Sequence, residues 1–353
     1  MISSVTIENF RALNRIELND LNRVNLISGR NNIGKSTLLE ALFLYMDHSS
    51  SDSFGKLNSF RGTIGTGVEG LWEPLFHQMN PDTPICISVV DDENKGILRY
   101  MRDNNYIPSN INGISEDVLA TFRIDTKKAY SLRYTYEDGD YSEEGHFSLN
   151  GTSILRDIKT SLPGNELKMM KPTQFQNTFF IRVRANALAN EIGNIELAGK
   201  KNILIQALQE MDSAIEDIVT LSLKGITQLY IRVSGKLMPL QYAGDGITQL
   251  LSICLSIMNQ KNGLVLIDEL ETGLHYSMYS KLWKIIENIT CQANCQVIAT
   301  THSYELISAV RDGISDTNDF SYYRIGTRAD GASAYRYDYS MLDSALESEM
   351  EVR

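Results

Sequence analysis

The sequence predicts an α/β protein built on a mixed sheet, with an antiparallel β section and a helical insertion. Three observations carry this prediction. A glycine-rich loop joins an apolar strand to a helical pattern near the N-terminus, apolar runs alternate with helical patterns in the last third, and apolar and polar residues alternate through much of residues 85–149. Continuous apolar runs indicate a parallel sheet buried on both faces, whereas alternation indicates strands with one solvated face.

The glycine-rich loop spans residues 29–37 and fits the pattern G-x-x-x-x-G-K-[ST]. In such a P-loop, successive backbone N–H groups and the N-terminus of the following helix hold phosphate oxygens. Gly29 and Gly34 allow the backbone to approach the phosphates closely. Lys35 reaches the β- and γ-phosphates, and the Ser36 hydroxyl is placed to bind Mg²⁺. The loop therefore predicts a nucleoside triphosphate site.

The remaining elements follow from apolar periodicity and from turn-forming residues. The first half is expected to hold strands at 4–7 and 16–18, a P-loop helix ending near 47, a loop over 54–70, antiparallel strands within 85–149, an irregular segment over 151–178 and a strand at 179–183. The second half is expected to hold helical structure over 187–221, a helix near 247–258, a buried strand at 263–267, a helix near 277–289 and a strand at 296–300.

Two of the predicted buried strands are followed by residues that can act on a phosphate. Asp268 and Glu269 end the first of them, and His302 follows the second. The carboxyl ends of parallel strands meet at the edge of the sheet where ligands bind. Asp268 suits the Mg²⁺ shell, Glu269 is placed to polarise an attacking water, and His302 can donate a hydrogen bond to a γ-phosphate. Combined with the P-loop, this pattern predicts nucleotide hydrolysis.

A second glycine-containing loop stands before the helix expected near residue 247. It consists of Ala243, Gly244, Asp245 and Gly246. Glycines at a helix start offer backbone N–H groups to an anion. One chain does not need two such sites for one nucleotide, so a dimer explains the loop if it covers the γ-phosphate bound by the partner's P-loop. The alternative is a plain loop with an acidic residue at a helix N-terminus.

In their order and spacing these motifs resemble the ABC-type ATPase heads of the RecF, SMC and overcoming-lysogenization-defect (OLD) group. The opening I-E-N-F-R-A-L at residues 7–13 is similar to the first strand of that group. Residues 322–353, which end in E-V-R, look like the stand-alone branch of OLD-like predicted ATPases. The resemblance covers the chain and is weakest over residues 50–180. It implies an ABC-type ATPase head of the P-loop NTPase fold, with ATP and Mg²⁺ as its ligands.

The resemblance also implies a role for each motif. Walker A is formed by Gly29, Asn31, Asn32, Gly34, Lys35, Ser36 and Thr37; Walker B by Asp268 and Glu269; the signature loop by Ala243, Gly244, Asp245 and Gly246; the D-loop by Gly273 and Leu274; and the switch histidine by His302. Arg11 is expected near the nucleotide, and Gln78 is a candidate for the Q-loop glutamine. Asn32 replaces a loop glycine, which asparagine tolerates because it adopts left-handed backbone. Ala243 replaces the signature serine.

As a single ATPase head, residues 1–353 are expected to divide into four sections. These are the first-lobe start with Walker A at 1–48, a β-rich section with an irregular insertion at 49–180, a helical arm and strand at 181–235, and a second lobe with the signature loop, Walker B and the switch histidine at 236–353.

Composition limits the classes of partner. The chain has 353 residues, a formal net charge of −11 and a sequence pI of about 5.0, which argues against a broad nucleic-acid surface. Four cysteines are too few for a disulfide framework in a chain of this length. Neither a signal peptide nor an apolar run of membrane-spanning length is evident, so we expect a cytoplasmic protein without a membrane partner.

The leading hypothesis is a homodimer of heads that sandwiches two ATP–Mg²⁺ complexes and opens on hydrolysis. By resemblance, such an ATPase works beside a separately encoded effector, a nuclease or toxin, in anti-phage defence. One alternative is a nucleotide-sensing regulatory scaffold with slow turnover. Another is a RecF- or SMC-like DNA-repair ATPase, which would show DNA-stimulated hydrolysis. Binding of DNA to the heads stays open at this point.

Overall fold

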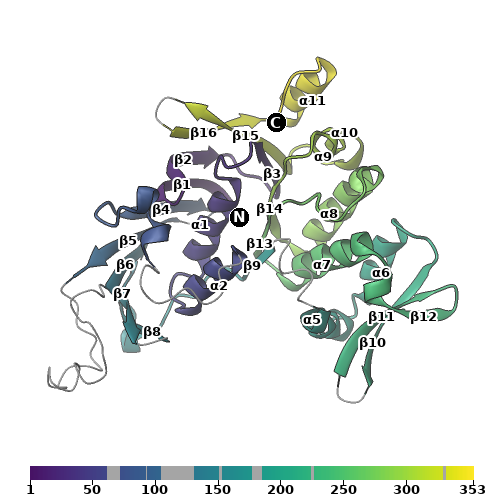
Figure 1. The fold of residues 1–353 in the computed structure, drawn as a ribbon, viewed down its shortest axis with the longest axis horizontal. Helices are drawn as coiled ribbons and strands as arrows, with labels where there is room; N and C mark the ends of the chain where they lie inside the picture. The colour runs from purple at the N-terminus through teal and green to yellow at the C-terminus, as the bar shows by residue number, and fades with distance from the viewer. Residues whose placement is uncertain are drawn as a thin grey trace. The chain divides into compact units, whose positions relative to one another are not determined.

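The computed structural model describes residues 1–61, 72–92, 94–104, 131–150, 153–176, 185–223, 226–328 and 331–353. The strand expected at 179–183 lies outside these residues. The chain divides into two compact units. Figure 1 labels their helices and strands. Unit 1 comprises Met1–Asp20, Asn32–Met170 and Gly326–Ala334, and unit 2 comprises Leu21–Asn31, Lys171–Ile325 and Tyr335–Arg353.

Unit 1 contains a seven-stranded sheet in the order β2-β1-β4-β5-β6-β7-β8, in which every neighbouring pair is antiparallel. Its strands are β1 (Ile2–Phe10), β2 (Leu13–Asn19), β4 (Ile85–Asp91), β5 (Lys95–Asp103), β6 (Ser131–Asp138), β7 (Tyr141–Asn150) and β8 (Ser153–Thr160). The antiparallel section expected within 85–149 is confirmed. The irregular segment expected over 151–178 is wrong at β8, a polar edge strand that forms because β7 offers it a full ladder of partners.

Helices α1 (Lys35–Met46) and α2 (Asp52–Phe60) pack on this sheet, and three 3₁₀ turns complete the unit: η1 (Glu73–Leu75), η2 (His77–Met79) and η3 (Pro163–Asn165). The loop expected over 54–70 is wrong for its first residues, which belong to α2. The ring of Phe54 lies 4.9 Å from the rings of both Trp72 and Phe147, and Leu57 is fully buried. Burial against residues distant in sequence thus overrides the weak helix propensity of a serine- and glycine-containing segment.

Unit 2 holds most of a six-stranded sheet in the order β16-β15-β3-β14-β13-β9, in which residues 326–334 of β15 and β16 belong to unit 1. Its strands are β3 (Val24–Gly29), β9 (Thr173–Gln176), β13 (Leu264–Ile267), β14 (Gln296–Thr300), β15 (Phe320–Arg328) and β16 (Gly331–Tyr337). The five strands from β15 to β9 are mutually parallel. Every residue of β3, β13 and β14 is buried, as their continuous apolar runs predict.

The helices of unit 2 are α5 (Ala185–Leu197), α6 (Lys201–Gln209), α7 (Asp245–Asn259), α8 (Tyr279–Ala293), α9 (Tyr304–Ser308), α10 (Val310–Gly313) and α11 (Tyr339–Glu347), with 3₁₀ turns η4 (Leu240–Tyr242) and η5 (Tyr276–Met278). A second sheet holds β10 (Ile215–Leu223), β11 (Ile226–Val233) and β12 (Lys236–Pro239). The helical expectation for 187–221 is therefore wrong from residue 215, where β-branched residues pair with β11. Among the described residues, none of the helices is both long and apolar enough to cross a bilayer.

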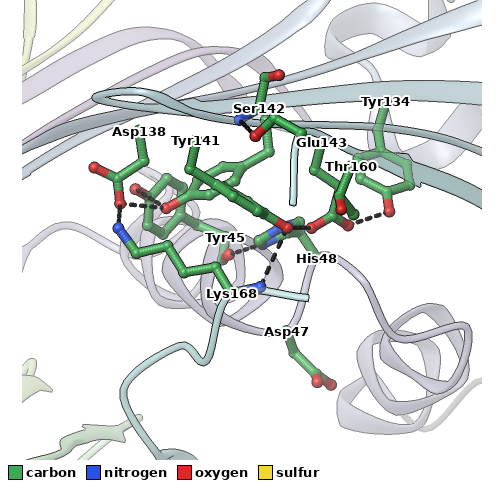
Figure 2. Close-up of polar contacts among 12 residues, drawn as sticks. Tyr45, Asp47, His48, Tyr134, Asp138, Tyr141, Ser142, Glu143, Thr160 and Lys168 are labelled. Carbon is green, nitrogen blue, oxygen red and sulfur yellow. Dashed lines mark hydrogen bonds and ion pairs between the residues drawn. The ribbon is translucent and has the colours of Figure 1, made fainter. Parts of the chain in front are cut away.

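A buried polar network ties α1 to the sheet of unit 1 (Figure 2). The Glu143 carboxylate of β7 accepts hydrogen bonds from the hydroxyls of Tyr134, at 2.5 Å, and Tyr141, at 2.6 Å. The Nε2 of His48, just beyond α1, lies 3.6 Å from the same carboxylate, while its Nδ1 donates to the carbonyl of Tyr45 at 2.8 Å. Burial acts to raise the pKa of Glu143, but these donors outweigh it and hold that pKa below its ordinary value.

We expect Glu143→Gln to destabilise the protein by about 1–3 kcal/mol at neutral pH, because the amide leaves donors without their charged acceptor. A carboxyl whose pKa is depressed on folding stabilises the fold above its unfolded pKa of about 4.3 and loses that contribution as the pH falls. The difference from wild type should therefore shrink in acid. Denaturant titrations at several pH values measure it.

The matched control is Glu144→Gln at the neighbouring position. Glu144 pairs with Arg133 at 2.8 Å on the surface, where 46% of its side chain is exposed. An exposed pair of this kind contributes at most about 1 kcal/mol. Equal losses for the two variants would contradict the role given to the buried network.

Candidate nucleotide site

Three strands of unit 2 end side by side at the carboxyl edge of its sheet. Strand β14 lies between β3 and β13, with Thr300 opposite Ile27 and Ala299 opposite Ile267. The backbone N–H of Thr301 donates to the carbonyl of Ile27 at 2.9 Å, which extends the pairing beyond the end of β14. The start of the P-loop, the Asp268–Glu269 pair and the segment with His302 therefore leave adjacent strands at one edge, which is where parallel sheets bind ligands.

Thr300 organises the two acidic residues. Its hydroxyl donates to Oδ1 of Asp268 at 2.6 Å and accepts the backbone N–H of Glu269 at 2.9 Å. Glu269 has φ of 53°, a left-handed conformation that is unfavourable for a glutamate and that this hydrogen bond supports. Its Oε2 also lies 3.4 Å from the hydroxyl of Thr272. Both carboxylates are thus held at the edge by side chains that the sequence analysis did not single out.

His302 is oriented by Glu271. The Nδ1–H of His302 donates to Oε1 of Glu271 at 3.0 Å, and the backbone N–H of His302 donates to the same oxygen at 2.8 Å. Glu271 is 7% exposed, whereas 52% of the His302 side chain is exposed. Because a carboxylate only accepts hydrogen bonds, this contact places a proton on Nδ1. The orienting residue lies in the motif E-T-G-L-H, but the sequence alone does not reveal its partner.

Gln176, the last residue of β9, lies beside Asp268 at the carboxyl edge of the sheet. Its carbonyl accepts the N–H of Asp268 at 2.8 Å, and its side-chain Nε2 donates to the carbonyl of Ser252 in α7 at 2.8 Å. Gln78, the Q-loop candidate, lies instead in η2 of unit 1 with φ of 54°. The sequence analysis named Gln78 alone, and Gln176 lies within the stretch that it expected to be irregular.

The expected signature and D-loops touch each other within unit 2. Gly244, with φ of 92°, precedes α7, which begins at Asp245. A Cβ added at Gly246 would lie 3.3 Å from the carbonyl oxygen of Gly273, so the two loops run close together. Gly273 itself has φ of 78°. A side chain at either glycine would disturb this pair of loops, which explains the residue type at both positions.

The P-loop passes from unit 2 to unit 1 between Asn31 and Asn32. Asn32 has φ of 63°, the left-handed conformation that its residue type tolerates. Gly34 has φ of 107° and stands directly before α1, and an added Cβ there would lie 2.6 Å from Cδ2 of Leu13. Lys35, Ser36 and Thr37 then form the first turn of α1, where backbone N–H groups lack helical acceptors and are available to an anion.

Behind this turn, one glutamate binds two arginines. Oε2 of Glu40 lies 3.0 Å from Nη1 of Arg11, and Oε1 of Glu40 lies 2.8 Å from Nε of Arg61. Arg61 also donates to the hydroxyl of Thr37 at 3.3 Å. Burial lowers the pKa of Arg11, an effect that Glu40 opposes and Arg61 adds to. Arg11 is thus attached to α1 one turn beyond Ser36, through a carboxylate that the sequence analysis missed.

The chain has recognisable relatives among known proteins. A family model described as "AAA domain, putative AbiEii toxin, Type IV TA system" matches residues 24–308. An ATP/GTP phosphatase of Helicobacter pylori is 24% identical over 344 residues, which cover 91% of this chain and 90% of that protein. The Septu protein PtuA of Bacillus thuringiensis is 22% identical over 329 residues, which cover 88% of this chain and 73% of that protein.

Solved structures of SMC heads share the fold. A head bound to the C-winged helix domain of ScpA aligns with a TM-score of 0.52 at 12% identity, covering 98% of this chain and 99% of that one. A head with an extended coiled coil, bound to the C-terminal domain of ScpA from Pyrococcus furiosus, aligns with a TM-score of 0.51 at 11% identity and covers 99% of both chains. At these identities the likeness concerns the fold alone, and it confirms the ABC-type head fold expected from the sequence.

We expect Thr300→Val to lower the turnover of ATP by roughly tenfold or more, because one isosteric change removes hydrogen bonds from both acidic residues of the edge. The matched control is Thr290→Val, since the buried Thr290 hydroxyl bonds within α8, to the carbonyls of Ile286 and Glu287. Steady-state ATPase assays with parallel denaturant titrations compare the two. A Thr300→Val protein that lost only as much activity as the Thr290→Val protein would contradict the organising role of Thr300.

Proposed function

Because the chain belongs to the family described as "AAA domain, putative AbiEii toxin, Type IV TA system" and is an ABC-type ATPase, we propose that it binds ATP with Mg²⁺, pairs with a second copy around the nucleotides and governs a separate effector. The observation that carries this proposal is the meeting of three strand ends: the P-loop begins beside the segment with His302, which in turn lies beside Asp268.

The residues present fit a magnesium ion. Mg²⁺ prefers hard oxygen ligands, takes few of them from the protein and completes its shell with water and phosphate oxygens. The Ser36 hydroxyl and the Asp268 carboxylate, itself oriented by Thr300, supply such oxygens in our proposal. The ion, when bound, would neutralise charge on the phosphates. Lys35 and the P-loop backbone would hold the β- and γ-phosphates, with Arg11 attached to the same helix through Glu40.

Glu269 and His302 are assigned the hydrolytic step. Glu269 would orient and polarise the attacking water, and His302, with Nδ1–H held by Glu271, would donate from Nε2 to the γ-phosphate as the doubly protonated imidazolium. The proposed pairing of heads uses the signature loop of a second copy, Ala243 to Gly246, to complete the pocket. Its closeness to the D-loop within unit 2 supports this assignment, because both loops would then meet the same partner.

The effector is proposed to be a nuclease or toxin encoded separately, acting with the ATPase in anti-phage defence. The family description, which names a putative toxin and a Type IV TA system, supports a link between this ATPase and a toxin system. The net charge of −11 favours a protein effector over an extended DNA surface. Co-purification of a neighbouring gene product, combined with an ATPase rate that DNA leaves unchanged, is the result expected of this arrangement.

We expect Lys35→Ala to weaken ATP binding by about a hundredfold or more, because the ammonium contacts the phosphates directly and no other residue replaces it. Isothermal titration with ATP and Mg²⁺ measures the loss. Lys56→Ala is the control, since Lys56 is an exposed lysine paired with Asp47 on the surface of unit 1. Unchanged ATP affinity in the Lys35→Ala protein would contradict the assigned site.

We expect Glu269→Gln to bind ATP normally and to hydrolyse it about 10²–10⁴-fold more slowly, because the amide cannot accept a proton from water. With hydrolysis blocked, the paired heads should persist, so the particle mass should double on adding ATP. Light scattering or mass photometry measures the mass, and Glu287→Gln on α8 is the control. Wild-type turnover by the Glu269→Gln protein would overturn the role given to Glu269.

A further inference from the structure

Residues 351–353 run back onto the six-stranded sheet after α11 ends. Val352 is 1% exposed and belongs to the apolar core of unit 2. Its carbonyl oxygen accepts the hydroxyl of Tyr322 on β15, and the hydroxyl of Ser28 on β3 lies within hydrogen-bond distance of both, at 3.2 Å from the carbonyl oxygen. Both of those residues are fully buried. Hydroxyls from two adjacent strands therefore hold this carbonyl.

The attachment point lies at the start of the P-loop. Ser28 is followed directly by Gly29, and in the parallel pairing of β3 with β15 Arg324 stands opposite Ser28. Nε of Arg324 donates to the carbonyl of Arg353 at 2.7 Å. Two successive carbonyls of the segment are thus bound at the level where β3 ends, so the segment holds the last residues of β3 in place.

The other end of the segment reaches the element that follows His302. The Arg353 guanidinium lies over the ring of Tyr304, 5.8 Å from its centroid, and Tyr304 is the first residue of α9. Glu351 holds this guanidinium, with its Oε1 3.1 Å from Nε of Arg353. The segment therefore contacts both the strand that leads into the P-loop and the helix that starts two residues after His302, all within unit 2.

We propose that residues 351–353 are a positioning element of the ATPase site, which keeps the end of β3 and the loop with His302 in a fixed mutual arrangement. The proposal rests on the nucleotide site proposed above. Phosphate held by the P-loop and the His302 imidazolium that would donate to it must keep their separation, because displacements near 1 Å cost about a hundredfold in rate. Support from a neighbouring segment meets that requirement without touching the nucleotide.

The exposure of the Arg353 and Glu351 side chains distinguishes a positioning role from a purely stabilising one. The exposed fraction is 50% for the Arg353 side chain and 57% for the Glu351 side chain. Exposed ion pairs and cation–π contacts contribute little to stability. Removal of the Arg353 side chain should therefore leave the fold intact while loosening α9. The expected signature is a loss of turnover without a matching loss of stability.

The test measures kcat, KM for ATP and melting temperature in the whole chain. We expect Arg353→Ala and Tyr322→Phe each to lower kcat roughly three- to tenfold, with KM changed less than about twofold. Arg353→Lys should recover most of the loss, because an ammonium also binds over an aromatic ring. Arg336→Ala, at an exposed arginine of β16, should match wild type.

A double-mutant cycle shows whether Arg353 acts through Tyr304. If it does, Tyr304→Leu lowers kcat as Arg353→Ala does, and the double variant loses no more than either single one. Additive losses, wild-type kcat in both Arg353→Ala and Tyr322→Phe, or a kcat loss that follows the melting temperature would each overturn the positioning role. The Lys35→Ala protein is assayed alongside. Full activity in this variant would contradict the proposed nucleotide site and therefore also the positioning role.

Discussion

The parallel register of β3, β14 and β13 is the constraint on which the rest of the site depends. Thr301 donates to Ile27 across one strand boundary, and Thr300 bonds to Asp268 and Glu269 across the other. Because side chains alternate along a strand, a slip of one residue in either pairing would point the Thr300 hydroxyl to the opposite face. The complete burial of these three strands makes such a slip costly, since apolar packing and register then favour the same arrangement.

Much of unit 2 was predictable because its signals are local. The strands β13 and β14 and the helices α7 and α8 lie within a few residues of their expected positions, since apolar runs and helical spacing there are uninterrupted. The P-loop was predictable for the same reason: its glycines and Asn32 adopt the left-handed or open conformations that their residue types indicate. Such features need no knowledge of what lies across the fold.

The parts that escaped prediction depend on partners distant in the chain. The helix α2 exists because Phe54 meets Phe147, and strand β8 exists because β7 offers it an edge. The orienting residues Thr300 and Glu271 are ordinary in sequence and acquire their roles only when two strand ends become neighbours. Strand β9 was missed for the same reason, since it is short, polar and paired with β13. Contacts between residues that are distant in the chain leave no periodic pattern in the sequence, so they cannot be predicted from it.

The chain is acidic, yet its ligand ATP is an anion, so the charges close to the phosphates decide whether the ligand is attracted. Charges separated by more than about 8 Å are largely screened at physiological ionic strength, so the net charge of −11 acts weakly at any one site. Around the first turns of α1, two guanidinium groups, those of Arg11 and Arg61, face the single carboxylate of Glu40, which leaves a local excess of positive charge. Lys35 and the positive end of the helix dipole add to it. The phosphates would therefore meet a local cationic field around the first turns of α1, although the net charge of the chain is negative.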